Sequence, residues 1–144
     1  MRAISKKQID DFLEARLEAD CWFSFDEKKQ WRAINSALDV INGAVQDAYK
    51  MVLHGDGNFD LEPKLLRAAA YAAYACISDN IITSKKLSMM GGVMIQEDEE
   101  CTTNDKCGCS AGVSIWQKVS EALSGFMPSS AQSVKLKIAG GRDY

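Results

Sequence analysis

The residues best suited to chemistry are the cysteines Cys101, Cys107 and Cys109. Thiolates bind zinc, but a structural zinc site takes four tetrahedral ligands, usually from pairs spaced Cys-x2–4-Cys. This cluster supplies three thiols, and the pair at 107 and 109 is closer than that spacing. His54, the single histidine, is distant in the sequence. The favoured interpretation is therefore loop thiols without a ligand, and the alternatives are a small metal-binding regulatory protein or a disulfide within the loop.

Catalysis is not expected from the remaining reactive side chains. A cysteine beside a histidine could form a nucleophile and its base, but nothing places Cys21 or Cys76 next to His54. Both cysteines have apolar neighbours in the sequence, which suits packing. The loop after His54 lacks the Gly-Lys-Ser/Thr of a phosphate-binding loop and the acidic positions of a calcium loop. We therefore expect neither an enzyme nor a cofactor.

The last part of the sequence carries a signal for binding another protein. Residues 133–139 alternate apolar and basic side chains, which is typical of a strand. They follow Pro128 and a Ser-rich linker, and a helical domain offers them no evident partner strand. Adding a strand to the sheet of another chain is a recurrent binding mode. Two partners stay open, a strand of another protein or residues 93–96 of the same chain.

Helical periodicity predicts the elements that would position these groups. Ser5 with Gln8 forms a capping box and predicts a first helix over 5–19. Its apolar face is expected to contain Ile9, Phe12, Leu13 and Leu17. A second capping box, Ser24 with Glu27, predicts the start of a long helix over 25–53.

The long second helix is predicted from an apolar seam with steps of three or four residues. The seam consists of Trp31, Ile34, Leu38, Ile41, Val45, Tyr49 and Val52. A helix of about 28 residues would be roughly 40 Å long. Long helices with one apolar face usually pack into a bundle or against copies of themselves. The Gly-rich segment after His54 predicts a loop, in which Gly55 would close this helix.

Two more helices are expected in the second half of the chain. Pro63 suits the first turn of a third helix that would reach residue 83. Small residues fill the middle of this helix, so it is expected to be central or to form a subunit contact. Residues 85–112 then predict a long loop, which in a compact domain suggests a function or a partner. A short fourth helix is expected over 113–126.

Together these patterns predict a mainly α fold, a small bundle of about four helices with a long central helix and a C-terminal β-like tail. We expect one helical domain over 1–128 and an extended tail over 129–144. The chain has 144 residues and a net charge of −3, and its basic residues are spread along the sequence. This balance does not favour nucleic-acid binding through phosphates. The sequence has no apolar run long enough to span a bilayer and no signal peptide, so a soluble protein without a membrane partner is expected.

The order of these parts resembles that of the head–tail adaptor, or connector, proteins of tailed bacteriophages. A short helix leads to the Trp-containing segment Ala19-Asp-Cys-Trp-Phe-Ser-Phe, and a long helix then carries Lys29-Gln-Trp-Arg-Ala-Ile-Asn-Ser-Ala-Leu-Asp-Val-Ile. A Gly-rich loop and Pro63 precede the Ala-rich stretch Leu65-Leu-Arg-Ala-Ala-Ala-Tyr-Ala-Ala-Tyr. The resemblance covers about 5–84 and, loosely, the tail. The Cys-rich loop departs from the pattern of the family.

This resemblance implies a structural virion protein, assembled in the host cytoplasm, that forms a ring at the neck between head and tail. Such a ring is usually twelvefold, docks on the portal protein, extends the DNA channel and offers a platform to the next neck or tail protein. Its partners would be the portal, neighbouring copies, that downstream protein, and DNA passing without sequence-specific binding. In such assemblies the tail commonly reaches into the portal. The residues expected to bind the portal are Ser133, Val134, Lys135, Leu136, Lys137, Ile138, Ala139, Arg142 and Tyr144.

Overall fold

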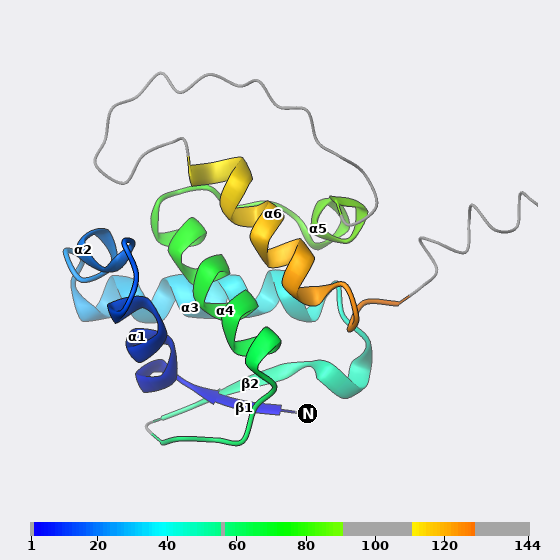
Figure 1. Ribbon diagram of the computed structural model, residues 1–144, viewed down its shortest axis with the longest axis horizontal. Helices are drawn as coiled ribbons and strands as arrows, with labels where there is room; N and C mark the ends of the chain where they lie inside the picture. Colours follow the sequence, from blue (N-terminus) through cyan, green and yellow to red (C-terminus); the bar gives the residue numbers. More distant parts are fainter. Residues whose placement is uncertain (1, 56, 91–110, 129–144) are drawn as a thin grey trace, which may run out of the picture.

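One helix, α4 (Pro63–Ile77), lies at the centre of the fold and three other helices pack around it (Figure 1). The computed structural model describes residues 2–55, 57–90 and 111–128. In chain order the elements are β1 (Arg2–Ser5), α1 (Lys6–Glu14), α2 (Ala19–Trp22), α3 (Glu27–Asn42), the 3-10 turn η1 (Asp47–Tyr49), β2 (Met51–His54), α4 (Pro63–Ile77), α5 (Ser84–Met90) and α6 (Ala111–Leu123). The prediction of a mainly α fold is confirmed.

The central position predicted for the Ala-rich helix is confirmed. Every residue of α4 from Ala68 to Ile77 is buried. Helices α1, α3 and α6 all contact it, so three neighbours cover its circumference. Small side chains let these neighbours approach closely, and larger ones such as Trp22 and Trp116 fill the surrounding space. Pro63 occupies the first turn of α4, as predicted, because its missing N–H would have no helical partner there.

The predicted length of the second helix is wrong, because α3 ends at Asn42. Gly43 is its C-cap residue, and a Cβ atom at this position would collide with the side chain of Ser84. The side chain of Asn42 then pairs with the backbone of Met51. Its Nδ2 donates to the Met51 carbonyl oxygen at 2.9 Å, and its Oδ1 accepts from the Met51 N–H at 2.8 Å. The second half of the apolar seam therefore lies in a turn, in η1 and in β2. The helix-like spacing of its residues is a coincidence.

A small parallel sheet joins β1 and β2, neither of which is predicted as a strand. Most of β2 falls within the helix predicted over 25–53, and most of β1 precedes the helix predicted over 5–19. β1 pairs with β2 in the register Arg2↔Met51 to Ser5↔His54. Gly55, predicted to close the second helix, follows this strand instead. The pairing ties the start of the described chain to the segment that precedes α4.

Of the two predicted capping boxes, the first is confirmed and the second is wrong. Ser5 caps α1 as predicted, since its Oγ accepts from the Gln8 N–H and the Gln8 side chain accepts from the Ser5 N–H, both at 3.1 Å. The second box is wrong, because Asp26 caps α3 by accepting from the Lys29 N–H at 2.9 Å. The Ser24 hydroxyl donates instead to the Cys21 carbonyl oxygen at 2.7 Å.

The other helix boundaries differ from those predicted. The first helix ends at Glu14 rather than 19, the third ends at Ile77 rather than 83, and the fourth is Ala111–Leu123 rather than 113–126. Asp79, with φ of 67°, adopts the left-handed conformation just after α4. Helix α5 occupies the start of the loop predicted over 85–112. The rest of that loop, 91–110, and the predicted tail, 129–144, lie outside the described residues.

Candidate interaction surfaces

The turn between α1 and α2 exposes a leucine almost completely. Leu17 is 97% exposed, although the sequence analysis placed it on the apolar face of the first helix. That placement is wrong because α1 ends at Glu14 and a turn follows. In this turn the Arg16 N–H donates to the Leu13 carbonyl oxygen at 3.0 Å, and the Ala19 N–H donates to the Arg16 carbonyl oxygen at 3.1 Å. No Gly or Pro between residues 14 and 19 marks the end of the helix, so the sequence carries no strong signal for this turn.

Hydrogen bonds fix the helices on both sides of this turn. The buried Trp22 of α2 donates from Nε1 to Asp10 Oδ1 of α1 at 2.8 Å. Lys6 Nζ pairs with the other oxygen of the same carboxylate at 2.8 Å. Gln30 of α3 donates to the Trp22 carbonyl oxygen at 2.9 Å. We call the segment 14–20 the α1–α2 corner, and these contacts hold it in a defined position on the surface.

The corner is acidic around its exposed leucine. It contains Glu14, Glu18 and Asp20 but a single basic residue, Arg16. Glu14 and Asp20 are exposed, and Glu18 is half-buried. The guanidinium carbon of Arg16 lies 4.0 Å from the centroid of the Phe12 ring. The corner therefore combines one apolar projection with a net negative charge.

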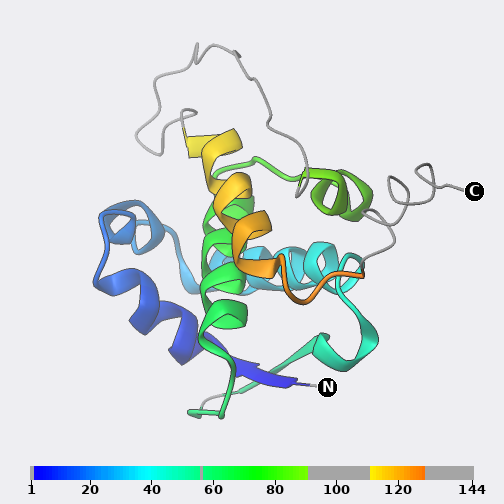
Figure 2. The ribbon, with the colours of Figure 1, turned by 45° about the vertical axis from the view of Figure 1, so that its right-hand side comes forward.

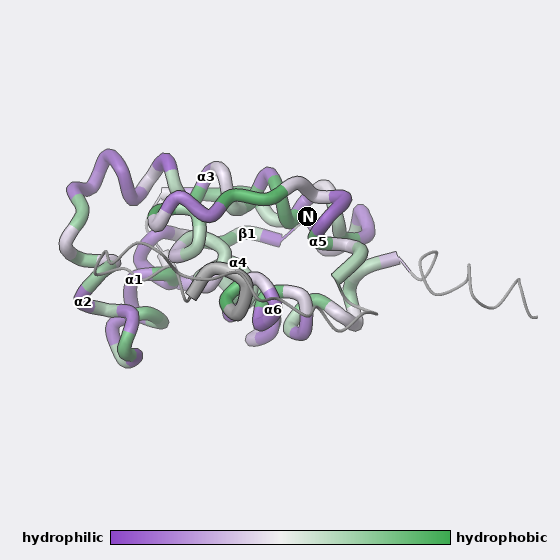
Figure 3. Tube along the Cα trace, turned by 90° about the horizontal axis from the view of Figure 1, so that it is seen from above, coloured by the Kyte–Doolittle hydropathy of each residue, from purple (hydrophilic) through white to green (hydrophobic). Residues whose placement is uncertain are grey.

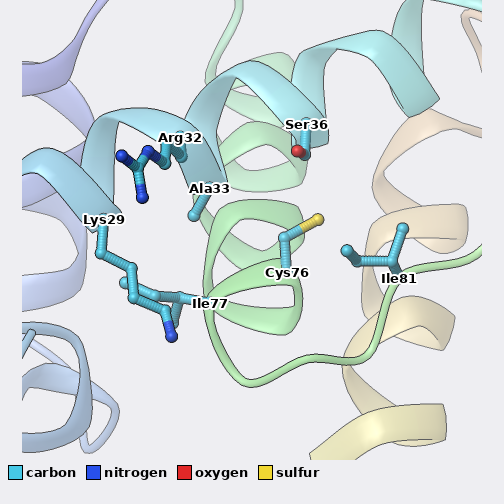
Figure 4. A pocket seen from close by; sticks show the side chains of 7 residues that line it. All are labelled: Lys29, Arg32, Ala33, Ser36, Cys76, Ile77 and Ile81. Atoms are coloured by element: carbon cyan, nitrogen blue, oxygen red, sulfur yellow. The ribbon is translucent and has the colours of Figure 1, made fainter.

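A pocket of about 240 Å³ lies between α3 and the end of α4 (Figure 4). Figure 4 shows Lys29, Arg32, Ala33 and Ser36 reaching it from α3, Cys76 and Ile77 from α4, and Ile81 from the segment that follows. Among the described residues, the lining includes two cations and no acidic side chain. The pocket thus has an apolar floor and a basic wall, and we call it the α3–α4 pocket.

The thiol in this pocket serves as an apolar lining group. Cys76 is buried and is a free cysteine, and burial raises the pKa of its thiol to about 12. The thiol is therefore protonated at neutral pH, where a nucleophile or a metal ligand would need the thiolate. This finding agrees with the packing role expected from the sequence for this residue.

A second exposed apolar residue lies at the far end of the molecule. Met89 of α5 is 59% exposed, and the neighbouring Lys85 and Lys86 are exposed as well. Helices α2 and α5 lie at opposite ends of the described structure in two views (Figures 1 and 2). The α1–α2 corner is therefore acidic around an apolar residue, and the exposed side of α5 is basic around one.

The residues just before the predicted tail are fixed to the helical body. The Phe126 carbonyl oxygen accepts from the Gln46 N–H at 2.9 Å, and the Met127 carbonyl oxygen accepts from the Gln46 side chain at 3.3 Å. The Phe126 ring packs edge-on against Tyr49 with centroids 4.7 Å apart. Whatever the tail binds, its attachment point is beside η1.

The site residues predicted from the sequence lie outside the described part of the chain. This applies to Cys101, Cys107 and Cys109 and to the portal-binding residues, which are Ser133, Val134, Lys135, Leu136, Lys137, Ile138, Ala139, Arg142 and Tyr144. Within the described ranges no group of three or more His, Cys, Asp or Glu side chains could hold a metal ion. None of the described helices is both long and apolar enough to cross a membrane. His54 is exposed, with its ring 5.5 Å from that of Phe59.

Comparison of the chain with models of protein families, with curated proteins and with solved structures finds no match.

Proposed function

We propose that this chain is a structural subunit that assembles head to tail into a ring, like the head–tail connector proteins of tailed bacteriophages. The observation that carries this proposal is Leu17, an almost fully exposed leucine on a turn between two well-anchored helices. Exposing a leucine to water forfeits the free energy of its burial, about 1.5 to 3 kcal/mol. A contact with another molecule would recover that energy.

The ring form of assembly is supported by the different character of distant surfaces. A head-to-tail contact joins two unlike patches, and it closes into a ring when the rotation between subunits allows. The acidic corner with Leu17 and the basic α3–α4 pocket are unlike surfaces of this kind. A twofold dimer would instead require one patch that complements itself.

In the proposed virion role, the ring docks on the portal, extends the DNA channel and carries the next neck or tail protein. Residues 133–139, with Arg142 and Tyr144, bind the portal. The hydrogen bonds of Gln46 to residues 126 and 127 support this assignment, since they give the tail a fixed origin on each subunit. Repeated around a ring, weak individual tail contacts add up to firm attachment.

The experiment that tests the proposal is sedimentation velocity ultracentrifugation and electron microscopy of the purified chain, alone and with the portal of the same virus. We expect closed rings that bind the portal. A chain that stays monomeric at every concentration and ignores the portal would contradict the proposal.

The matched control is a variant that lacks 133–144. We expect it to keep the helical circular dichroism of the full chain and to lose portal attachment. Unchanged attachment would show that the tail is not the portal-binding segment.

A further inference from the structure

We infer that the α1–α2 corner of one copy inserts Leu17 into the α3–α4 pocket of the next copy. This inference deepens the proposed function and rests on it, because it names the two surfaces that would join neighbouring subunits. The corner supplies the projection, since Leu17 is 97% exposed. The pocket supplies the cavity, and its wall includes Ile81, which is itself 59% exposed.

The sizes of the two surfaces match. An apolar cavity of about 150 Å³ holds a benzene molecule. The α3–α4 pocket, at about 240 Å³, therefore has room for a leucine side chain and part of the turn that carries it. Its apolar lining from Ala33, Cys76 and Ile77 is the environment that such a side chain needs.

The charges also match. Glu14 and Glu18 flank Leu17 within one helical turn of sequence, and Lys29 and Arg32 line the pocket. Leucine in the pocket would bring the acidic side chains towards this basic wall. Complementary charges of this kind mainly set the orientation of docking and the rate of association. Insertion of an acidic corner therefore suits this pocket better than insertion of a basic one.

The contact must be made between chains. Leu17 cannot occupy the pocket of its own chain, because its side chain is almost entirely exposed. Figure 3 shows α3 along one long side of the molecule, whereas α2 lies at one end, towards the opposite side. Each copy therefore offers one corner and one pocket, which are two unlike surfaces, and this is the condition for a contact that repeats around a ring.

The test uses two full-length variants, each of which damages one half of the contact. Leu17→Asp removes the apolar projection and leaves the pocket intact. Arg32→Glu reverses a charge of the basic wall and leaves the corner intact. Each variant alone is expected to weaken self-association at least about tenfold, as loss of a central interface residue does. Sedimentation velocity ultracentrifugation measures the distribution of monomers, dimers and larger oligomers for each.

A mixture of the two variants gives the decisive measurement. The intact corner of the Arg32→Glu variant should insert into the intact pocket of the Leu17→Asp variant. The mixture is therefore expected to form a one-to-one heterodimer that grows no further, since its free corner and its free pocket are the damaged ones. Lys28→Glu is the matched control, because Lys28 is exposed on the same helix without lining the pocket.

The outcomes separate this inference from the proposed function. Rings that survive both variants would overturn the inference and leave the ring itself standing. A mixture without heterodimers would also overturn the inference. So would a Lys28→Glu variant that weakens self-association as much as Arg32→Glu does. If the variants disrupt only binding to the portal or to a tail protein, the occupant of the pocket is that partner and the inference is wrong. The unaltered chain could instead form open filaments that either substitution abolishes and that do not bind the portal. That result would support the corner–pocket contact and overturn the connector role.

Discussion

Helix α4 and the α1–α2 corner both contain alanine and leucine, yet these residues lie at opposite extremes of burial in the two segments. In α4 three neighbouring helices cover every residue from Ala68 to Ile77. In the corner, Leu17 projects from a turn and Ala15 is exposed. Apolar composition alone therefore does not decide what is buried, because burial also depends on how many elements the fold brings around a segment. Leu17, the most exposed of the large apolar residues in the described part of the chain, is therefore available to a partner.

The largest expected effect comes from placing the same charge in the core that α4 shares with α3 and, separately, in the corner. Leu38 is 5% exposed and belongs to the hydrophobic core that α4 shares with α3. Leu38→Asp is expected to lower the free energy of unfolding by about 4 kcal/mol or more, because a carboxylate would be buried without a partner. Leu17→Asp is expected to change it by less than about 0.5 kcal/mol, as exposed substitutions usually do. Urea denaturation followed by circular dichroism measures both, and a stable, folded Leu38→Asp variant would contradict the core assignment.

A second pair of substitutions tests how tightly α4 is packed. Ala72 is fully buried, and Ala72→Leu adds volume where the neighbouring helices approach closely. Overpacking of this kind is expected to cost about 1 to 3 kcal/mol. Ala15→Leu makes the same change at an exposed position and should be nearly neutral. Thermal or urea unfolding of the two variants gives the difference, and equal stabilities would mean that α4 is loosely packed.

The smallest expected effect concerns two ion pairs and depends on pH. Hydrogen bonds from the Arg2 guanidinium, the shortest at 2.7 Å, hold the pKa of Glu62 below its usual value. The folded state therefore binds this proton less readily than the unfolded state, so the pair stabilises the fold above about pH 4.3 and loses its effect as the pH falls through the folded pKa. Glu62→Gln should remove that contribution, and the gap between the two proteins should narrow from pH 7 to pH 3.

The matched variant for this measurement is Asp11→Asn. It breaks the pair between Lys7 and Asp11, whose side chains are 52% and 57% exposed. Solvent screens an exposed pair of this kind, so little change in stability is expected. Urea midpoints at several pH values compare the two variants. The prediction would be wrong if Asp11→Asn changed the pH dependence of stability more than Glu62→Gln did.

Local signals account for the parts of the fold that could be predicted. Ser5 and Gln8 are close enough in sequence to cap a helix by themselves, and Pro63 suits a first helical turn whatever surrounds it. The predictions are wrong where segments distant in the sequence determine the local structure. Asn42 ends the helical region by pairing with Met51, and β2 exists because β1 lies beside it, neither of which a periodic pattern reveals.

The corner and the pocket were harder to predict from the sequence than the fold. Leu17 has the spacing of a buried helical residue, and only the end of α1 at Glu14 exposes it. The α3–α4 pocket depends on where the chain turns after Ile77, which again is a property of the folded arrangement. The tail and the cysteine cluster stay predictions.

The pairing of β1 with β2 also bears on the order in which the protein can fold during synthesis. Arg2 leaves the ribosome well before its partner Met51 and before the α4 surface against which α1 packs. Such long-range contacts must wait for the intervening chain, which slows folding. Until then the apolar face of α1 has no surface to cover it, so the nascent chain stays vulnerable to proteases and to aggregation until α4 has emerged.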